Sequence, residues 1–352
     1  MTSLLSSFTW REQLSFWFAV LMLCIGISRS AGGTVLEADG ARFVVNGRPT
    51  FLVGVSYYGA LGAPRDFVRR DLDDIRRGGF NWVRIWATWA AFGTDVSAVS
   101  ANGLAREPFL NGLKWLVSEC DRRGLVVDVT LTRGSATAGA AGGCVTNLEA
   151  HLRAAETLVL TLKTKRNWYL DLANEHDVRD ARFVSAGELK KLREAVRRLD
   201  PNRLVTASFG GHDLTEGDVR ESLLELGMNF LAPHRPREPG SPSETESKTR
   251  GLLGVMGRLG HTAPVLYQEP FRRGYPPWEP VAEDFLADLR GAIDGGAAGW
   301  CLHNGAQSGA ADRQPRRSFD LRAKRLFEQL DAEELKAIGS IRGIVAVRAS
   351  ER

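Results

Sequence analysis

Two glutamates end apolar segments of this chain, and carboxyl groups placed in this way suit acid–base chemistry. Glu175 closes a run that begins at Trp168, and Glu269 closes another that begins at Ala263. Two carboxyl groups that face each other can cleave a glycosidic bond, because one protonates the leaving oxygen while the other attacks the anomeric carbon. Such chemistry requires a fold that brings the two chain ends together.

Short apolar runs of this kind recur eight times and predict the strands of the fold. They span residues 51–56, 81–86, 125–131, 168–175, 203–209, 228–234, 263–269 and 297–304. Most are nearly continuous in apolar residues, which is typical of strands buried on both faces. A β-hairpin is expected before them, over residues 34–45.

Helical patterns separate the runs. Val68, Leu72 and Ile75 follow the i, i+4, i+7 spacing of a helix, and Ser185 with Glu188 predicts a capping box at the start of another. Links from helix to strand are short, whereas several links from strand to helix are long. The long links span residues 87–106, 132–147, 235–244 and 305–318.

This alternation predicts an α/β fold, a (β/α)8 TIM barrel with a short N-terminal β-hairpin. In such a barrel the active site lies at the C-terminal face, where the long loops gather. The alternative is a doubly wound open sheet, which usually carries a glycine-rich phosphate turn after its first strand. Here Tyr57 and Tyr58 stand in place of that turn. The barrel is therefore favoured.

In a closed barrel the ends of all strands meet at one rim, so we expect Glu175 and Glu269 to share one mouth. The alternative for each is a surface glutamate in an ion pair, the usual fate of this residue type. The apolar lead-in to Glu175 argues against it, because a charge that ends a buried strand faces the barrel mouth. Cleavage with retention needs carboxyl groups about 5 Å apart.

Longer motifs resemble those of the clan A glycoside hydrolases, most nearly the family 5 group of cellulases and mannanases. The resemblance runs from about Phe43 to Phe327. The opening hairpin and first strand of that clan resemble FVVNGRPTFLVGVSYYG, and its second strand resembles GFNWVRIW. The fourth-strand Asn-Glu motif is similar to DLANEHD, the seventh-strand nucleophile motif to YQEP, and the eighth strand to GAAGWCLHNG.

The resemblance implies that Glu175 is the acid/base and Glu269 the nucleophile. It also implies that Asn174 hydrogen-bonds the sugar 2-hydroxyl and that Arg84 keeps Glu269 ionised. A cation beside Glu269 lowers the pKa of that carboxyl, and we expect the pKa of Glu175 to stay high, which separates the two roles. The alternative for Arg84 is an ordinary ion pair with an acidic neighbour.

Aromatic side chains near strand ends are candidates for sugar contacts, since flat rings match the apolar faces of pyranose rings. The residues expected to bind substrate are Tyr58, Trp86, Tyr267, Trp300 and His234, beside Asn174 and Arg84.

The chain departs from the family pattern in three places, one of which is His176 after Glu175, where the family frequently has proline. No histidine ends strand three, which reads TLTRGS, and the family's His-x-Tyr after strand six is replaced by His234-Arg235-Pro236. We expect His234 to keep the role of that histidine and Tyr58 or Tyr267 to replace the tyrosine. These departures affect the assignment of the family and of the substrate, and they leave the expected roles of the two glutamates unchanged.

The first thirty residues predict a cleaved signal peptide. An apolar run over 14–27 follows Arg11, and the small residues Ser28 and Ser30 allow cleavage before Ala31. A transmembrane helix needs about 20 apolar residues, so an uncleaved membrane anchor is the weaker alternative. Residues 31–352 are expected to form a single (β/α)8 glycoside hydrolase domain of a secreted or periplasmic protein.

Composition argues against other classes. The net charge of +4 comes from 46 basic and 42 acidic residues, and no basic cluster indicates a nucleic-acid partner. The six histidines lack zinc-ligand spacing, so we expect neither metal nor cofactor. Cys120, Cys144 and Cys301 follow the signal peptide and cannot all pair with one another, and the sequence leaves open whether any two do.

The sequence therefore predicts an exported, monomeric, retaining glycoside hydrolase with no stable membrane association after cleavage. Its expected substrate is a β-linked oligo- or polysaccharide of the β-glucan or β-mannan type. One alternative is an exported saccharide-binding barrel without catalysis, against which both glutamates, Asn174 and Arg84 argue. Another is a transglycosylase, which uses the same residues with a different acceptor.

Overall fold

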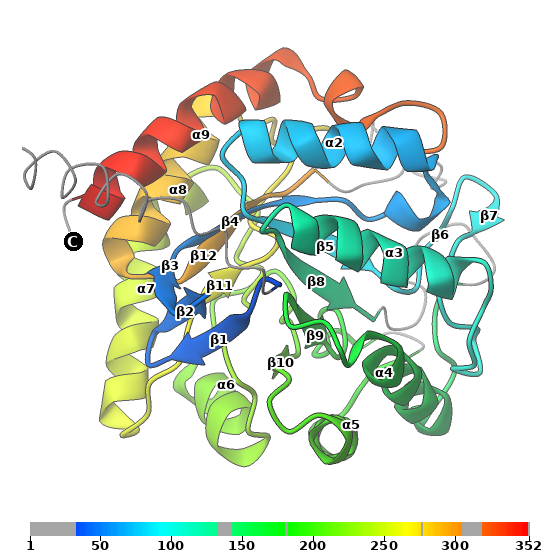
Figure 1. The fold of residues 1–352 in the computed structure, drawn as a ribbon. Coiled ribbons are helices and arrows are strands. Elements are labelled where there is room, and N and C mark those ends of the chain that lie inside the picture. Colours follow the sequence, from blue (N-terminus) through cyan, green and yellow to red (C-terminus); the bar gives the residue numbers. More distant parts are fainter. Residues whose placement is uncertain (1–32, 132–142, 180–181, 276, 305–318, 351–352) are drawn as a thin grey trace, which may run out of the picture. The chain divides into compact units, whose positions relative to one another are not determined.

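The computed structural model describes residues 33–131, 143–179, 182–275, 277–304 and 319–350. The chain divides into Met1–Gly33 and a compact unit from Thr34 onward, which contains every element given below. In this unit the strands gather at the centre and the helices surround them (Figure 1). The predicted signal peptide, residues 1–30, lies outside the described residues.

The strands of the central sheet are short and parallel. They are β4 (Leu52–Ser56), β5 (Trp82–Trp86), β8 (Val126–Thr130), β9 (Trp168–Asp171), β10 (Val205–Thr206), β11 (Leu266–Tyr267) and β12 (Gly299–Leu302). Two small antiparallel sheets consist of β1 (Leu36–Asp39), β2 (Arg42–Val45) and β3 (Arg48–Thr50), and of β6 (Ala90–Ala91) and β7 (Thr94–Asp95).

Helices alternate with these strands along the chain. They are α2 (Arg65–Arg77), α3 (Phe109–Arg122), α4 (Leu148–Leu162), α5 (Ala186–Leu199), α6 (Glu216–Arg220), α7 (Ser241–Arg258), α8 (Ala282–Gly295) and α9 (Ala332–Ser350). A π-helical turn, Glu221–Glu225, continues α6. None of the helices in the described segments is both long enough and apolar enough to cross a bilayer.

The barrel closes through a segment of irregular backbone. Seven strands pair in the order β10-β9-β8-β5-β4-β12-β11. The sixth apolar run, residues 228–234, forms no regular strand, but isolated bridges join Phe209 to Pro233 and Leu231 to Val265. This segment therefore links the two edges of the sheet, and the predicted (β/α)8 barrel is confirmed.

Side chains alternate between the barrel interior and the helical layer along each strand. Trp82 and Val126 belong to the interior cluster, whereas Val83 and Val127 pack in the cluster that the helices share. Gly54 makes room for the indole inside the barrel, because a Cβ at this position would lie 1.8 Å from the Trp82 ring. The interior is thus filled by side chains rather than left as a pore.

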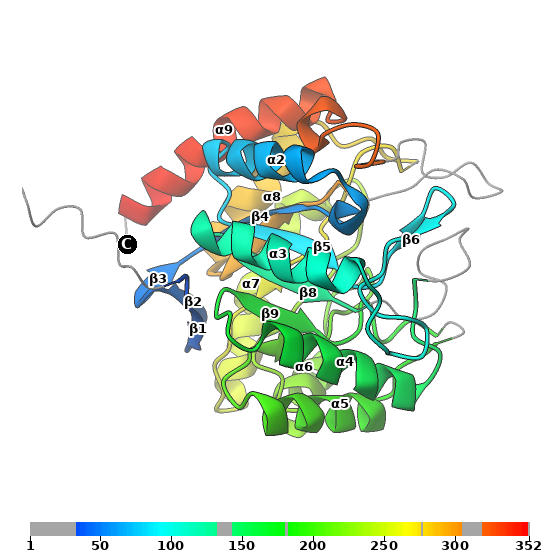
Figure 2. The same cartoon turned by 45° about the vertical axis from the view of Figure 1, so that its right-hand side comes forward.

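The N-terminal hairpin closes one end of the barrel. Leu36 of β1 and Phe43 of β2 join the interior cluster, and the Phe43 ring packs edge-on against Phe230 with a centroid distance of 5.2 Å. Figure 2 shows this hairpin at one end of the barrel and β6 at the other. The predicted hairpin is confirmed, and the opposite mouth is left to the loops that follow the strands.

Two predicted helix signals are present in the structure. Ser185 and Glu188 form the capping box of α5, and the buried face of α2 carries Val68, Leu72 and Ile75. Burial of such a stripe, rather than helix propensity alone, provides most of the stability of helices of this length.

The link predicted over residues 235–244 is shorter than expected. Helix α7 begins at Ser241 and has Pro242 in its first turn, where the missing N–H of proline costs no helical hydrogen bond. Gly240, with φ of 92°, turns the chain into the helix. The prediction of a loop is therefore wrong beyond Gly240, because proline and serine here mark the start of a helix.

Candidate active site

The two predicted glutamates both lie just beyond strand ends. Glu269 follows β11, and Glu175 follows β9 after a short turn. Glu175 has φ of 49°, a left-handed conformation that non-glycine residues rarely adopt and that is common at functional sites. Its N–H donates to Ser208 Oγ at 3.1 Å, and the N–H of Asn174 donates to Leu131 O at 2.9 Å. Neighbouring strand ends therefore hold this turn.

The side chains of the two glutamates meet at the mouth. One carboxylate oxygen from each, together with a ring nitrogen of His234, lie within 4.8 Å of one another. His234 Nδ1 is 3.1 Å from Glu175 Oε1 and 3.7 Å from Glu269 Oε2. Arg237 Nη2 donates to Glu175 Oε1 at 3.1 Å and to Glu269 Oε2 at 2.8 Å. A guanidinium thus bridges the predicted pair.

Arg84 is fully buried beside Glu269 and connects the polar groups of the mouth. Its Nη1 donates to Glu269 Oε1, and its Nη2 donates to Asn174 Oδ1 at 2.8 Å. The carboxylates of Asp128 and Asp171 lie 3.1 and 3.2 Å from the same guanidinium. Because its planar fork engages several partners at once, Arg84 fixes the orientation of Glu269 as well as supplying charge.

Tyr58 and Trp86, which the sequence predicts as substrate-binding residues, lie in the same region of the barrel mouth. The Tyr58 hydroxyl donates to Glu269 Oε1 at 3.0 Å. The Tyr58 ring lies 4.7 Å from Trp86 and 5.5 Å from Trp89, measured between ring centroids. These aromatic side chains form one cluster beside the nucleophile candidate.

Tyr267 and Trp300, predicted as substrate contacts, lie on the wrong side of their strands. The Tyr267 hydroxyl is 2.7 Å from Thr249 Oγ1 on α7. Trp300 Nε1 donates at 2.7 Å to Asp288 Oδ2 on α8. Both rings are fully buried against the helices, so the prediction of sugar contacts is wrong. Strand alternation is the reason, because it turns every second side chain outward.

Positive neighbours decide the ionisation of both glutamates. Burial opposes charge on Glu269, but histidines and arginines around it, including Arg84, hold its pKa well below the ordinary value. Burial also opposes charge on Glu175, yet the hydrogen bond with His234 and the charge of Arg237 lower its pKa to about 2. The predicted high pKa of Glu175 is wrong for this arrangement, because Arg237 was not foreseen between the carboxylates.

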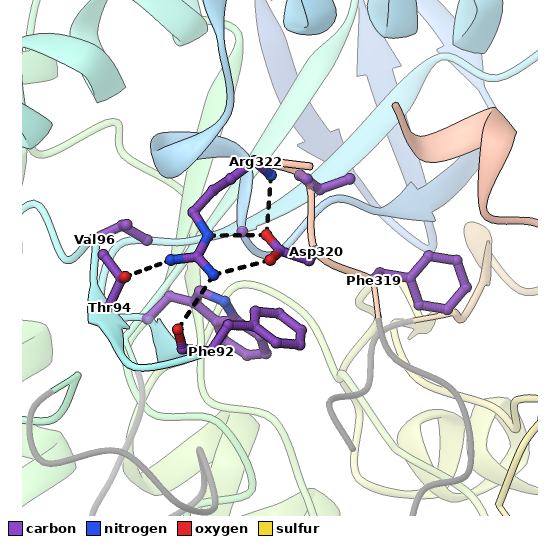
Figure 3. Close-up of a pocket in the computed structure, with 9 residues that line it drawn as sticks. Phe92, Thr94, Val96, Phe319, Asp320 and Arg322 are labelled. Carbon is purple, nitrogen blue, oxygen red and sulfur yellow. Dashed lines mark hydrogen bonds and ion pairs between the residues drawn. The ribbon is translucent and has the colours of Figure 1, made fainter. Parts of the chain in front are cut away.

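A hollow adjoins the aromatic cluster (Figure 3). It is lined by Gly59, Trp89, Phe92, Thr94, Val96, Phe319, Asp320, Leu321 and Arg322. Arg322 donates to Phe92 O at 3.2 Å and to Thr94 Oγ1. The same guanidinium pairs with Asp320 Oδ2 at 2.9 Å. Arg322 therefore fastens the β6–β7 hairpin to the segment before α9, and with it the chain that carries Trp89.

Sequence reasoning missed three side chains of the site. Arg237 bridges the two glutamates, and His303 Nδ1 lies 3.5 Å from Glu269 Oε2. Arg272 Nη1 donates to His303 Nε2 at 2.8 Å. All three follow strand ends, which was the available signal. Arginines after strands are common on protein surfaces, however, so position alone does not single them out.

The site also contains donor types that bind metal ions. Glu175, His234 and Glu269 offer two carboxylates and an imidazole at suitable spacing. Arg237 donates to both carboxylates from the same space, however, and a second cation there would be repelled at short range. The residues present therefore fit a guanidinium better than a metal ion.

These features define a (β/α)8 barrel with paired carboxylates at its mouth. No protein-family model matches the chain, and no curated protein matches its sequence. An endo-1,4-beta-mannanase from Rhizomucor miehei superposes with a TM-score of 0.61 at 12% identity, covering 89% of this chain and 99% of that one. A glycoside hydrolase family 5 mannosidase from the same fungus gives 0.61 at 14%, covering 90% and 99%.

A beta-glucuronidase from an uncultured Clostridium sp. shares the fold as well. Its TM-score is 0.58 at 12% identity, covering 88% of this chain and 53% of that one. The predicted resemblance to family 5 glycoside hydrolases is thus confirmed at the level of the fold. Neighbours that are named for different sugars have this fold in common, so the fold does not select a substrate.

Proposed function

We propose that this protein is a retaining glycoside hydrolase of β-linked glycans, with Glu269 as nucleophile and Glu175 as acid/base. The supporting observation is the approach of their carboxylates to within 4.8 Å at the barrel mouth. Retaining enzymes hold these groups about 5 Å apart, whereas inverting enzymes leave about 6.5–9.5 Å for a water molecule. The motifs that resemble family 5 cellulases and mannanases, rather than the shared fold, are the reason for proposing a substrate of the β-mannan or β-glucan type.

The proposed reaction has two displacements. In the first, a Glu269 oxygen bonds to the anomeric carbon while the glycosidic C–O bond breaks, and Glu175 gives its proton to the leaving oxygen. In the second, Glu175 takes a proton from water, the water oxygen bonds to the anomeric carbon, and Glu269 departs as a carboxylate. The first step leaves Glu175 ionised, as the second step requires. The second step restores protonated Glu175 and ionised Glu269 for the next turnover.

Neighbouring groups favour this division of roles. Arg84 and Tyr58 both donate to Glu269 Oε1, which keeps the proposed nucleophile ionised and leaves its second oxygen toward the mouth. Asn174 precedes Glu175 and is oriented by Arg84 at 2.8 Å. We propose that its amide contacts the sugar 2-hydroxyl, where a hydrogen bond strengthens in the transition state.

Arg237 must leave its present position for the reaction to proceed. Its Nη2 is 2.8 Å from Glu269 Oε2, the oxygen that an anomeric carbon would approach. Withdrawal of this cation also lets the pKa of Glu175 rise from about 2 toward the range that a general acid needs. The arrangement seen here is therefore a resting state of the proposed enzyme.

Catalysis can be tested with aryl β-glucosides, β-mannosides and β-glucuronides together with β-glucan and β-mannan. We expect Glu269→Gln to lower kcat by about 10³-fold or more, and Glu175→Gln to lower it by about 10²–10⁴-fold. Glu246→Gln, an exposed change on α7, is the matched control. EDTA should leave turnover unchanged, since no step uses a metal ion.

Two results would contradict this function. One is the absence of turnover of every substrate by the wild-type protein, which would favour the saccharide-binding alternative. The other is undiminished activity of the Glu269→Gln variant. A transglycosylase would keep both glutamates essential but release mainly longer saccharides, which product analysis by mass spectrometry distinguishes.

We further propose that the protein acts outside the cytoplasm as a monomer, after removal of residues 1–30. The apolar run over 14–27 with small residues before Ala31 supports export. A polymeric glycan also has to be met outside the cell membrane.

A further inference from the structure

Arg237 reaches both proposed catalytic carboxylates from a loop. It lies between the sixth barrel segment and α7, and its Nη2 bridges Glu175 and Glu269. Its Nε donates to Pro270 O at 3.2 Å, which sets the guanidinium against the chain that follows the nucleophile candidate. The side chain remains 27% exposed, so it approaches the glutamates from the open side of the mouth.

The charges of the two site arginines are balanced in different ways. Arg84 has its own carboxylates on the barrel side, Asp128 and Asp171. The ion pairs of Arg237 with described residues are those with Glu175 and Glu269. Among the described residues, the charge of Arg237 is therefore balanced by the two groups that act in the proposed reaction.

The proposed double displacement removes both of these negative charges in turn. Glu175 has to be protonated before it can act as an acid, and Glu269 becomes a neutral ester when it attacks. At each stage one of the two carboxyl groups is therefore neutral, and a partly buried guanidinium that loses an ion-pair partner is destabilised. The sugar also needs the space beside Glu269 Oε2 that Arg237 fills. Arg237 must therefore exchange the glutamates for another anion as substrate enters.

The surroundings of Arg237 favour an anion as the replacement. Arg272 follows the nucleophile candidate by three residues, and its charge acts on Arg237, as the lowered pKa of Arg272 reflects after the larger effect of burial. His303 lies between Arg272 and Glu269, with ring nitrogens 2.8 Å from Arg272 Nη1 and 3.5 Å from Glu269 Oε2. The guanidinium groups of Arg237 and Arg272 thus both lie on this side of the mouth.

We propose that the sugar at the scissile bond carries a carboxylate, as in a uronic acid, and that Arg237 leaves the glutamates to bind it. This inference rests on the proposed function and narrows it from neutral glucan or mannan to an acidic β-linked glycan. A carboxylate can accept two parallel hydrogen bonds from a guanidinium, which a neutral hydroxymethyl group cannot replace. Arg237 then binds the sugar carboxylate and leaves Glu175 and Glu269 in the same step.

The wild-type protein provides the first test. We expect kcat/KM for an aryl β-glucuronide to exceed that for the matched aryl β-glucoside and β-mannoside by at least about 100-fold, because a site built for a charged group rejects analogues that lack it. Equal or better turnover of a neutral glycoside would overturn the inference while leaving the proposed hydrolase intact. Turnover of neither class would instead remove the proposed function, and the inference with it.

The second test compares two arginine substitutions. Arg237→Gln should lower kcat/KM for the glucuronide by about 100-fold and change that for neutral glycosides by less than about tenfold, so that the preference collapses. Arg250→Gln removes the same charge from an exposed site on α7 and should leave both values within about twofold. Thermal unfolding of each variant verifies that it is folded.

Other responses of Arg237→Gln would contradict the proposal. A rise in activity on both substrate classes would mean that Arg237 only obstructs the mouth. An equal fall on both would mean that it only positions the two glutamates. The pH profile adds a readout that a purely structural role would not move. In the kcat/KM profile, which reports the free enzyme, the high-pH limb should shift upward without Arg237, since Glu175 loses a cation that lowers its pKa.

Discussion

Glu269 is surrounded by side chains that come from other strands of the barrel. Arg84 comes from β5, Tyr58 from the turn after β4, and His234 from the sixth segment. Their convergence on one carboxylate compensates for its burial and keeps it ionised. A proposed nucleophile in this state needs no further deprotonation before it attacks.

Ion pairing of Glu175 predicts a specific pH dependence of stability. Its pKa in the folded protein, about 2, lies below its ordinary value of 4.5. Folding therefore gains from this group above about pH 4.5 and loses the gain as the pH falls toward 2, by at most about 3 kcal/mol. Urea denaturation between pH 3 and 7 should show a shallower acid decline for Glu175→Gln than for the wild type. Parallel curves for the two proteins would contradict this assignment.

Single residues differed in how far the sequence could predict them. Glu175 and Glu269 follow apolar strands, and a barrel necessarily gathers such positions at its mouth. Arg84 lies in the middle of β5 rather than at its end, and its place beside Glu269 was implied by the family resemblance. Arg237 also follows an apolar run, but the direction in which a loop side chain points depends on everything it packs against. The pKa of Glu175 could not be predicted for the same reason, since it depends on Arg237.

At the scale of strands, alternation decides which aromatic rings reach the mouth. Gln268 faces the barrel interior, where its Nε2 donates to Asp128 Oδ2 at 2.7 Å, so Tyr267 beside it must face the helices. The same alternation buries Trp300 against α8. Strand residues are known to alternate between the two faces of a sheet. In nearly continuous apolar strands, however, the sequence does not show which residues face the barrel interior and which face the helices.

Packing inside the barrel predicts the cost of a small change at Gly54. A methyl group there would lie 1.8 Å from the Trp82 ring, so Gly54→Ala should lower the free energy of unfolding by about 1–3 kcal/mol through overpacking. Gly251→Ala is the matched control, because Gly251 lies in α7 with no neighbour within 4 Å. That variant should gain about 0.4–1 kcal/mol.

Denaturant midpoints of both alanine variants provide the measurement. A Gly54→Ala protein as stable as the wild type would mean that the indole of Trp82 can move aside. Such a result would contradict the close packing inferred for the interior.

At the scale of the whole chain, the predicted signal peptide leads to a testable expectation about processing. Expression of the full chain in a secreting bacterial host should yield a protein that begins at Ala31, as measured by intact mass, and that elutes as a monomer. Leu21→Arg, which interrupts the apolar run, should keep the full-length chain inside the cell. Recovery of uncleaved wild-type protein with the membrane fraction would instead support the anchor.

The sequence by itself determined the barrel, its hairpin and the strand ends that carry Glu175 and Glu269. These follow from local patterns, since apolar runs, caps and turns act over a few residues and repeat along the chain. Only the tertiary structure decided that Arg237 bridges the pair, that Tyr58 rather than Tyr267 contacts Glu269, and that Trp300 faces α8. The physical reason is that contacts between distant segments depend on loop paths and strand faces, which no local pattern specifies.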